Sequence, residues 1–314
     1  MNFDIPCSAE SLDRIRKYIN RTPLSYSERL SHECGSKIYL KLENLQKTGS
    51  FKVRGALNKV VNMSSDRPVV AASSGNHGAA VSYALNKKQN KGKIYVPNNV
   101  KDLKAENIRS YGSEVIKFGD DCLDAENEAI RVSKKNNYTF ISPYNDLDVI
   151  SGQGTIGVEI LEENDNIDVV FITVGGGGLI SGISHYLKSK KPKIKVIGCS
   201  PENSSIMINS IKHGKIVNSK SKDTLSDGSA GGVEEGSITF DLCNNLIDDF
   251  CLVSESEIAK QIKDSHNYDK IVIEGSAAVA IASALKMKEK FKNKNIAIII
   301  CGGNIGSETL KSII

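Results

Sequence analysis

The sequence of 314 residues predicts an α/β protein built on open parallel sheets. Strand-like and helix-like segments alternate almost from end to end, an order that gives parallel strands with helices on their faces. Several strand-like segments, such as residues 168–174 and 295–300, are continuous apolar runs, as expected of strands that are covered on both sides. The chain is also long enough to form two domains.

The first predicted strand is indicated by Ile38, Leu40 and Leu42, which alternate with polar residues. The predicted strands are residues 38–42, 69–72, 93–96, 114–118, 138–141, 168–174, 195–198 and 295–300. Helical patterns lie between most of them, including residues 79–85, 121–135, 154–162, 179–188, 256–264 and 276–288. We find no internal repeat, low-complexity tract or obvious linker.

Composition excludes several classes of protein. The net charge of +4 comes from scattered lysines, with no basic block and no tryptophan, so a nucleic-acid partner is not expected. Charged residues interrupt residues 1–20, unlike a signal peptide, and no apolar run is long enough to span a membrane. Seven widely spaced cysteines without a Cys-x-x-Cys pair argue against disulfides and zinc. We therefore expect a cytoplasmic protein.

Four glycines, Gly175 to Gly178, follow one predicted strand and directly precede a helix. Ligands of open parallel sheets bind at such loops, outside the carboxyl ends of the strands. Glycines let several N–H groups point at one spot, and the start of the helix adds a positive dipole end. The loop lacks the spacing of nucleotide-binding motifs, so a phosphate monoester fits it better. A tight glycine turn without a ligand is the alternative.

A second loop, Ser73 to Gly78, also joins a strand to a helix. Its small hydroxyls and its amides suit a carboxylate, and Asn76 can donate to a ring oxygen. A helix-capping loop with no ligand fits the local sequence equally well. His77 has no metal-ligand spacing and is interpreted as structural.

Cys301 follows the last predicted strand and precedes Gly302 and Gly303. A buried cysteine at a strand end usually serves packing. A neutral thiol beside a glycine turn can also face an aromatic ring nitrogen without protonating it. The local sequence does not choose between these two interpretations.

Lys52 stands where a strand-like segment is expected to give way to a helix. Ser50 is a good helix N-cap, and Val53, Leu57 and Val60 have the spacing of one buried helix face. A cation is disfavoured at a helix start. Either the amine reaches water along a long side chain, or it is held neutral and forms a Schiff base.

These features have a common explanation in one cofactor. Pyridoxal phosphate has an aldehyde for Lys52, a phosphate for the glycine loop and a pyridine nitrogen for Cys301. The sequence also resembles the threonine dehydratase and serine racemase family of fold-type II pyridoxal-phosphate enzymes over nearly its whole length. The resemblance rests on the segments Ser50-Phe51-Lys52-Val53-Arg54-Gly55-Ala56, Ser73-Ser74-Gly75-Asn76-His77, Gly152-Gln153-Gly154-Thr155, Gly175-Gly176-Gly177-Gly178-Leu179 and Cys301-Gly302-Gly303-Asn304.

The resemblance implies roles for individual residues. Lys52 would hold the cofactor covalently and later remove the substrate α-proton, and Glu274 would lie near the cofactor ring, although as an acid at a helix start it needs no function. The implied cofactor-binding residues are Phe51, Lys52, Asn76, Gly175, Gly176, Gly177, Gly178, Leu179, Glu274 and Cys301. The implied substrate-binding residues are Ser73, Ser74, Asn76 and His77.

The implied reaction is the dehydration of L-threonine or L-serine to a 2-oxo acid and ammonia. Ser74 keeps a racemase open as an alternative, because serine racemases have serine there, on the cofactor face opposite the lysine. The glycine-rich segment 227–236 resembles a dehydratase branch acting on larger 3-hydroxy amino acids, so such a substrate is a further alternative.

The resemblance also implies an overall organisation. Residues 1–64 and 146–314 would form a large cofactor-binding domain and residues 65–145 a small mobile domain, with the cofactor in the cleft between them. A homo-oligomer, dimer or tetramer, is expected, without the regulatory domain of biosynthetic threonine dehydratases. Relatives that bind magnesium or calcium carry acids where this chain has Ser200 and Ile206, so we expect no metal.

Overall fold

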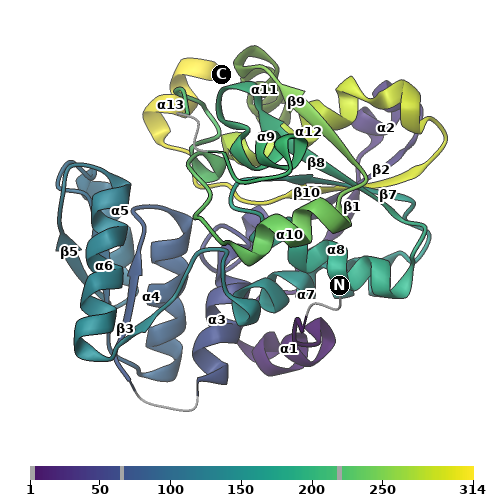
Figure 1. Ribbon diagram of the computed structural model, residues 1–314. Helices are drawn as coiled ribbons and strands as arrows, with labels where there is room; N and C mark the ends of the chain where they lie inside the picture. The colour runs from purple at the N-terminus through teal and green to yellow at the C-terminus, as the bar shows by residue number, and fades with distance from the viewer. Residues whose placement is uncertain (1–3, 64–66, 218–220) are drawn as a thin grey trace.

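The computed structural model describes residues 4–63, 67–217 and 221–314 and contains two β-sheets (Figure 1). The larger sheet has the strand order β1-β2-β10-β7-β8-β9, and the smaller has the order β5-β4-β3-β6. All paired neighbours are parallel except β1, which runs antiparallel to β2. The predicted α/β fold with open parallel sheets is therefore confirmed.

The strands lie close to the positions that the apolar runs predict. Their bounds are β1 Leu24–Tyr26, β2 Lys37–Leu42, β3 Val69–Ala72, β4 Gly92–Val96, β5 Glu114–Lys117, β6 Thr139–Phe140, β7 Val169–Thr173, β8 Lys195–Pro201, β9 Asp249–Val253 and β10 Asn295–Ile300. Sequence patterns missed β1 and β9. Both are edge strands that are only partly buried, so neither shows the continuous apolar run of the central strands.

Helices connect and cover these strands. The α-helices are α1 Ser8–Ile15, α2 Glu28–Cys34, α3 Lys52–Asn62, α4 Asn76–Lys88, α5 Asp102–Ser110, α6 Cys122–Asn136, α7 Leu147–Glu163, α8 Gly178–Lys190, α9 Ile206–His213, α10 Ile238–Leu246, α11 Glu255–Asp264, α12 Gly275–Lys286 and α13 Ser307–Ile313. Short helical turns include η2 Glu43–Leu45 and the π-helical turn η5 Ser265–Asp269. Figure 1 shows α7 and α8 beneath the larger sheet and α11 and α12 above it.

Helix α7 is the buried centre of the molecule, and glycines bring its neighbours very close. A Cβ atom on Gly152 would lie 2.7 Å from the Cα atom of Gly55 in α3. On the other side, a Cβ atom on Gly182 of α8 would lie 2.1 Å from the carbonyl oxygen of Ile150. Real side chains do not tolerate these distances, so α3, α7 and α8 cross at glycine contacts. The start of α3 is thereby placed against α7.

The smaller sheet has its own apolar surroundings. Its strand β3 packs on α4 and α6, and two apolar clusters there include Val70 and Ala71. After β6 the chain leaves the smaller sheet and enters α7. Asp146 caps this helix, since its carboxylate accepts from the amides of Asp148 and Val149. The division into domains at 64/65 and 145/146 remains a prediction, and its first boundary lies outside the described residues.

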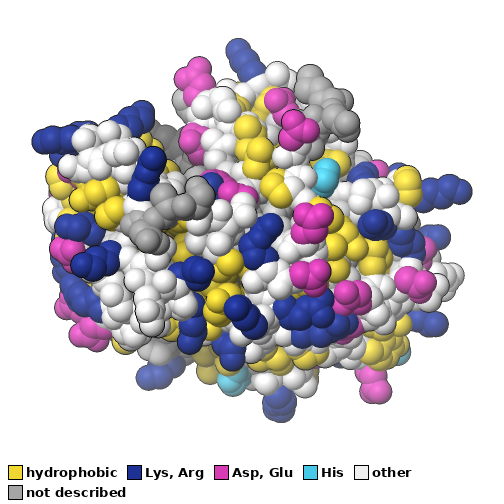
Figure 2. Space-filling model, turned by 90° about the horizontal axis from the view of Figure 1, so that it is seen from below, with side chains coloured by type: hydrophobic (Ala, Val, Ile, Leu, Met, Phe, Trp, Pro, Cys, Tyr) yellow, Lys and Arg dark blue, Asp and Glu magenta, His cyan; other side chains and the backbone are white. Residues whose placement is uncertain are grey.

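The surface viewed from below carries basic and acidic side chains intermixed (Figure 2). No helix among the described residues has both the length and the apolar character that a membrane span requires.

Candidate active site

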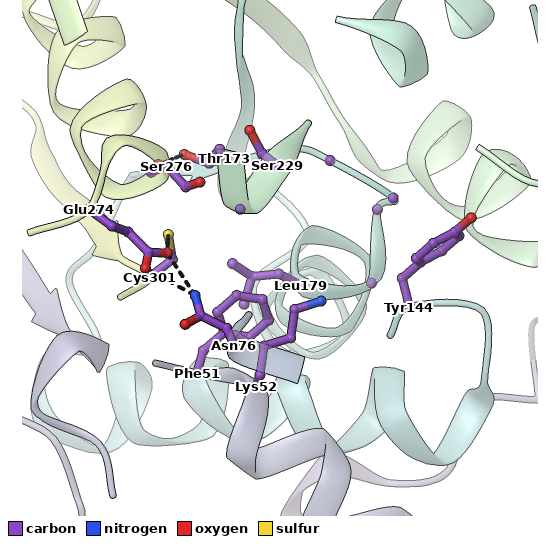
Figure 3. A pocket seen from close by; sticks show the side chains of 15 residues that line it. Phe51, Lys52, Asn76, Tyr144, Thr173, Leu179, Ser229, Glu274, Ser276 and Cys301 are labelled. Carbon is purple, nitrogen blue, oxygen red and sulfur yellow. Dashed lines mark hydrogen bonds between the residues drawn. The ribbon is translucent and has the colours of Figure 1, made fainter. Parts of the chain in front are cut away.

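One pocket is lined by residues from segments that adjoin both β-sheets (Figure 3). The space without atoms in this pocket, including its opening to solvent, is about 470 Å³. Its lining residues are Phe51, Lys52, Asn76, Tyr144, Thr173, Gly175, Gly176, Gly177, Gly178, Leu179, Gly228, Ser229, Glu274, Ser276 and Cys301. All ten residues predicted to bind the cofactor are in this set. They come from five separate segments of the chain.

Backbone contacts bring Lys52 beside Cys301. Ser50 forms an antiparallel bridge with Gly302, and the amide of Phe51 donates to the carbonyl of Cys301 at 3.0 Å. The predicted strand before Lys52 is wrong, because this bridge is isolated and the preceding residues form a short helical turn and a loop. The predicted N-cap is also wrong: α3 begins after Phe51 without a side-chain cap, and the buried hydroxyl of Ser50 has no hydrogen-bond partner in the described part of the chain.

The amine of Lys52 points into the pocket (Figure 3). Its Nζ donates to the carbonyl of Pro143 at 2.9 Å and lies 5.2 Å from the centre of the Phe51 ring. Burial lowers the pKa of this amine to about 8, an effect partly offset by Cys301 and Glu274. A larger fraction of the amine is therefore neutral near neutral pH than for an ordinary lysine, as attack on an aldehyde requires.

The lowered pKa of Lys52 predicts an unusual pH dependence. We expect the rate at which an amine-specific reagent modifies Lys52 in cofactor-free protein to rise with a midpoint near pH 8. Exposed lysines should react with a midpoint near their ordinary value of about 10.4. Peptide mass spectrometry after brief modification between pH 6 and 11 measures both in one sample. A Lys52 midpoint near 10 would contradict the proposed environment.

The glycine loop forms one wall of the pocket at the start of α8. The amides of Gly175, Gly176 and Gly177 donate to no group of the described residues. A Cβ atom on Gly176 would lie 2.4 Å from the ring of Tyr144, and one on Gly175 would lie 2.8 Å from the carbonyl oxygen of Ser229. The loop therefore accepts no side chains here. Free amides at a helix N-terminus are suited to an anion.

A buried polar cluster lies at the opposite side of the pocket from Tyr144 (Figure 3). Glu274 precedes α12 but does not cap it, and its carboxylate accepts from Asn76 Nδ2 at 3.0 and 3.1 Å and from the Cys301 thiol at 3.8 Å. Burial, reinforced by Glu274, raises the pKa of Cys301, so this thiol stays neutral. Asn76 Oδ1 accepts from Asn304 at 2.7 Å. These contacts tie the first residue of α4 to Glu274 before α12 and to the residues that follow β10.

The other residues of the serine loop do not line the pocket. Ser73 and Ser74 are partly buried, and the Ser73 hydroxyl accepts from the amide of Gly75. The Ser74 hydroxyl has no partner among the described residues. His77 is buried with Nε2 2.9 Å from the carbonyl oxygen of Ile141, and burial lowers its pKa to about 3. Its ring is thus neutral, as the structural interpretation of this histidine expects.

Five lining residues were not predicted: Tyr144, Thr173, Gly228, Ser229 and Ser276. Thr173 and Ser276 are joined by a hydrogen bond from the threonine hydroxyl to the serine carbonyl, at 2.6 Å. Thr173 ends the strand before the glycine loop, and this position could have indicated from the sequence that it lines the site. Tyr144 stands alone between two elements, and no local pattern indicates that it reaches the pocket.

Ser200 and Ile206 occupy the two positions at which metal-binding relatives were expected to carry acids, and both make other contacts. Ser200 is buried and donates to the carbonyl of Val174 at 2.9 Å, while Ile206 is a buried apolar residue that opens α9. Within the described ranges, no three His, Cys, Asp or Glu side chains gather as metal ligands would. The expected absence of a metal remains a prediction.

Comparison with known proteins matches residues 15–302 to the family of pyridoxal-phosphate dependent enzymes. The chain belongs to this family. It is 42% identical over 308 residues to an L-threonine ammonia-lyase of Thermotoga maritima, covering 97% of this chain and 76% of that protein.

Two solved structures are also very similar in fold. A serine racemase from maize has a TM-score of 0.92 at 33% identity, over 98% of this chain and 96% of the other. The processed form of threonine deaminase isoform 2 from Solanum lycopersicum has a TM-score of 0.91 at 35% identity, over 98% and 92%. The family membership confirms the expected cofactor class, pyridoxal phosphate.

The pocket fits this cofactor. The free amides of the glycine loop match a phosphate, and the amine of Lys52 matches an aldehyde. The neutral thiol of Cys301 would leave a ring nitrogen unprotonated. Asn76 and Glu274 also line the pocket, and Asn76 Nδ2 lies within hydrogen-bond distance of both oxygens of Glu274.

Proposed function

We propose that the protein is a threonine/serine ammonia-lyase. It would convert L-threonine to 2-oxobutanoate and ammonia, and L-serine to pyruvate and ammonia. The main structural support is one pocket in which the Lys52 amine, with its lowered pKa, shares a cavity with the unengaged amides of the glycine loop. The 42% identity to an L-threonine ammonia-lyase supports the choice of substrate.

In this proposal the polar residues that line the pocket bind different parts of the cofactor. Pyridoxal phosphate supplies an aldehyde that joins the substrate amine and a ring that takes up electrons as the α-proton leaves. The amides of Gly175 to Gly178 and Leu179 hold the phosphate at the start of α8. Cys301 would keep the ring nitrogen neutral, which would favour loss of the β-hydroxyl over other outcomes. Phe51 would pack beside the ring.

Lys52 carries the proton transfer. Its amine must be neutral to accept the α-proton, and burial lowers its pKa towards the range in which a base works well at neutral pH. The amides of the loop from Ser73 to His77 hold the substrate carboxylate at the start of α4. The reaction removes water from the amino acid, and the enamine that leaves then takes up water and releases ammonia.

A panel of L-hydroxy amino acids tests this function. We expect protein reconstituted with pyridoxal phosphate to release 2-oxobutanoate from L-threonine and pyruvate from L-serine, with one ammonia per 2-oxo acid. Lactate dehydrogenase coupling and mass spectrometry measure the products. The proposal is wrong if neither amino acid gives a 2-oxo acid, and a product only from a longer 3-hydroxy amino acid would move the substrate to that class.

Racemisation is a second candidate activity. It is supported by the likeness to the maize serine racemase and by Ser74, whose hydroxyl has no partner among the described residues. By the family resemblance, the Ser74 hydroxyl would lie across the cofactor from Lys52 and would return a proton with inverted configuration. Chiral chromatography of L-serine reactions decides: D-serine that disappears in Ser74→Ala, with pyruvate formation kept, supports this role. Absence of D-serine from the unmodified enzyme excludes it.

The cellular compartment, the oligomeric state and the closure of the small domain belong to the same proposal. All seven cysteines are free and five of them are buried, as in a protein of the reducing cytoplasm. A homo-oligomer, dimer or tetramer, and closure of residues 65–145 over the substrate are proposed by family resemblance.

A further inference from the structure

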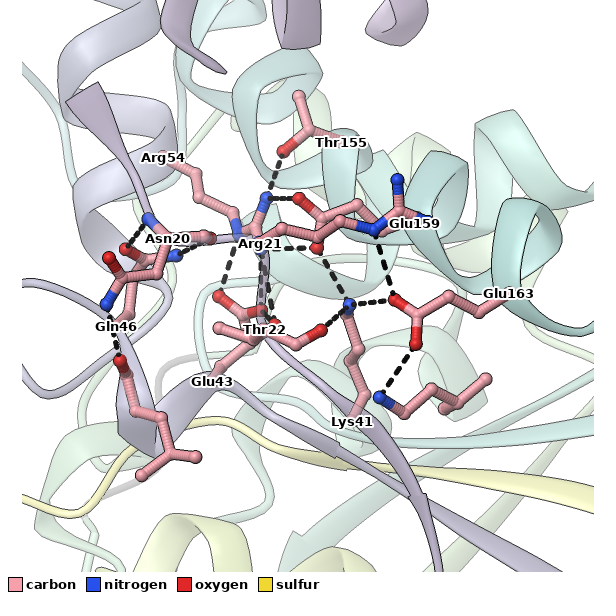
Figure 4. Close-up of polar contacts among 12 residues, drawn as sticks. Asn20, Arg21, Thr22, Lys41, Glu43, Gln46, Arg54, Thr155, Glu159 and Glu163 are labelled. Carbon is pink, nitrogen blue, oxygen red and sulfur yellow. Dashed lines mark hydrogen bonds and ion pairs between the residues drawn. The ribbon is translucent and has the colours of Figure 1, made fainter. Parts of the chain in front are cut away.

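A buried ionic network lies beneath the first turn of α3 (Figure 4). It joins Arg54 of α3, Glu43 of η2, Glu159 of α7 and Lys41 of β2, with Thr22 beside them. All five residues are at most 1% exposed. None of them lines the pocket, so the chemistry of the site does not account for this group of charges.

Arg54 is the centre of the network. Its Nε and Nη2 donate to the two oxygens of Glu43 at 2.7 and 2.8 Å, and its Nη1 and Nη2 donate to the two oxygens of Glu159 at 2.8 Å each. Nη1 also contacts the hydroxyl of Thr155. The planar guanidinium is the only cationic side chain that can pair with two carboxylates in this way.

The network fastens α3 to two rigid elements. Glu43 follows strand β2 directly, and Glu159 lies within the long helix α7. Lys41 adds a second connection, because its Nζ donates to Glu159 at 2.7 Å and to the carbonyl of Thr22 at 2.6 Å. In the fully buried part of the network two cations face two carboxylates, so each of these charges is compensated. Lys41 Nζ also lies 3.4 Å from the partly exposed carboxylate of Glu163.

Arg54 and Lys52 lie on opposite sides of the same helical turn. Two positions along an α-helix correspond to a rotation of about 200°, so a guanidinium held below the helix turns the Lys52 side chain towards the pocket. No side-chain cap holds this helix start. Besides the network, the start of α3 is held by the hydrogen bond from the Phe51 amide to the Cys301 carbonyl. The contact of Gly55 with Gly152 and the hydrogen bond from the Gly55 amide to Gln153 hold it as well, but none of these contacts is an ion pair.

We propose that Arg54 is a positioning residue for Lys52: its paired contacts with Glu43 and Glu159 fix the rotation of α3 and so hold the lysine amine within reach of the cofactor aldehyde. This inference rests on the proposed function. The network acts through position, since its buried opposite charges balance and the pKa of the Lys52 amine is set by burial and by Cys301 and Glu274, none of which belongs to the network.

Arg54→Lys tests the proposal because it keeps the charge and removes the paired geometry. We expect visible absorbance to develop about 10-fold more slowly when pyridoxal phosphate is mixed with cofactor-free protein. We also expect kcat to fall about 10- to 100-fold with little change in KM, since a small displacement of a reacting group is enough for such a loss. The pH midpoint for Lys52 modification should remain near 8.

Arg29→Lys is the matched control. Arg29 makes a similar paired contact, from Nε and Nη2 to the two oxygens of Asp269, and connects α2 to η5 without touching α3. We expect this variant to form the visible band at the wild-type rate and to keep wild-type kcat. A slowdown shared by both variants would show a general effect of losing a paired arginine and would overturn the specific role.

A second variant keeps the test decisive if Arg54→Lys does not fold. Arg54→Met with Glu43→Met removes one cation and one carboxylate and leaves the pair of Lys41 and Glu159, and such apolar replacements of buried ion pairs are often tolerated. Wild-type band formation and kcat in either folded variant overturn the proposal. The proposal is also overturned if the activity of a variant returns on cooling in parallel with its folded fraction, because Arg54 would then serve stability alone. A wild type without any visible band would instead refute the proposed function.

Discussion

Replacing Lys52 by alanine will abolish the visible absorbance that the protein shows with pyridoxal phosphate. Lys52 is the one amine-bearing side chain among the residues that line the described pocket, so no other amine there can join the aldehyde. We also expect kcat to fall by at least about 10²–10⁴-fold, the usual contribution of a positioned general base. An absorbance titration from 300 to 500 nm and the 2-oxo acid assay measure the two effects.

Lys47→Ala is the control for this substitution. Lys47 lies five residues earlier on the same connection but is exposed, so its loss should leave both absorbance and kcat unchanged. The melting temperature of Lys52→Ala should stay close to that of the wild type, because the amine makes a single hydrogen bond, to Pro143. Activity within a few-fold of wild type in a folded Lys52→Ala protein would refute the assigned role.

Replacing Gly175 by alanine will weaken cofactor binding. The added Cβ atom would lie 2.8 Å from the carbonyl oxygen of Ser229 and 3.0 Å from its Cα atom, so the glycine loop or the Ser229 segment must move. Loss of one hydrogen bond to a charged group costs about 1.5–3 kcal/mol. We therefore expect the dissociation constant of pyridoxal phosphate to rise about 10- to 100-fold.

Gly232→Ala separates this effect from a general loss of glycine. A Cβ atom at Gly232 meets nothing within 4 Å, and its φ is not positive, so the substitution should not change cofactor affinity. Equilibrium absorbance titration of cofactor-free protein gives both constants, and melting curves without cofactor verify the fold. Equal affinity in Gly175→Ala and wild type would mean that these amides do not hold the phosphate.

The fold could be predicted where buried strands leave a recognisable pattern of apolar residues in the sequence. Strands β7 and β10 are covered on both faces and therefore appear as apolar runs, and their predicted and observed bounds agree closely. The edge strand β1 spans three residues with a half-exposed pattern, so no periodicity marks it. Its antiparallel direction depends on pairing with β2, which no local pattern encodes.

The candidate site divides in the same way. The glycine loop could be predicted because free amides at a helix start need small residues in sequence, and Lys52 because an amine there is unusual. Tyr144 and Ser229 could not, since they are distant in sequence and contact the pocket only through the folding of separate segments. Ser50 was misassigned as a cap because its bridge with Gly302 is a long-range contact.

By itself, the sequence determined the parallel α/β architecture, and it singled out the glycine loop and Lys52 as candidates for a phosphate site and a reactive amine, because each is unusual among its neighbouring residues. Only the tertiary structure decided how Lys52 is held. Its lowered pKa arises from burial among segments far apart in the chain, and its direction depends on where α3 is fastened. Arg54 stands two residues from Lys52 in the sequence, yet its partners Glu43 and Glu159 are found only by folding, because a buried charge must be matched in space.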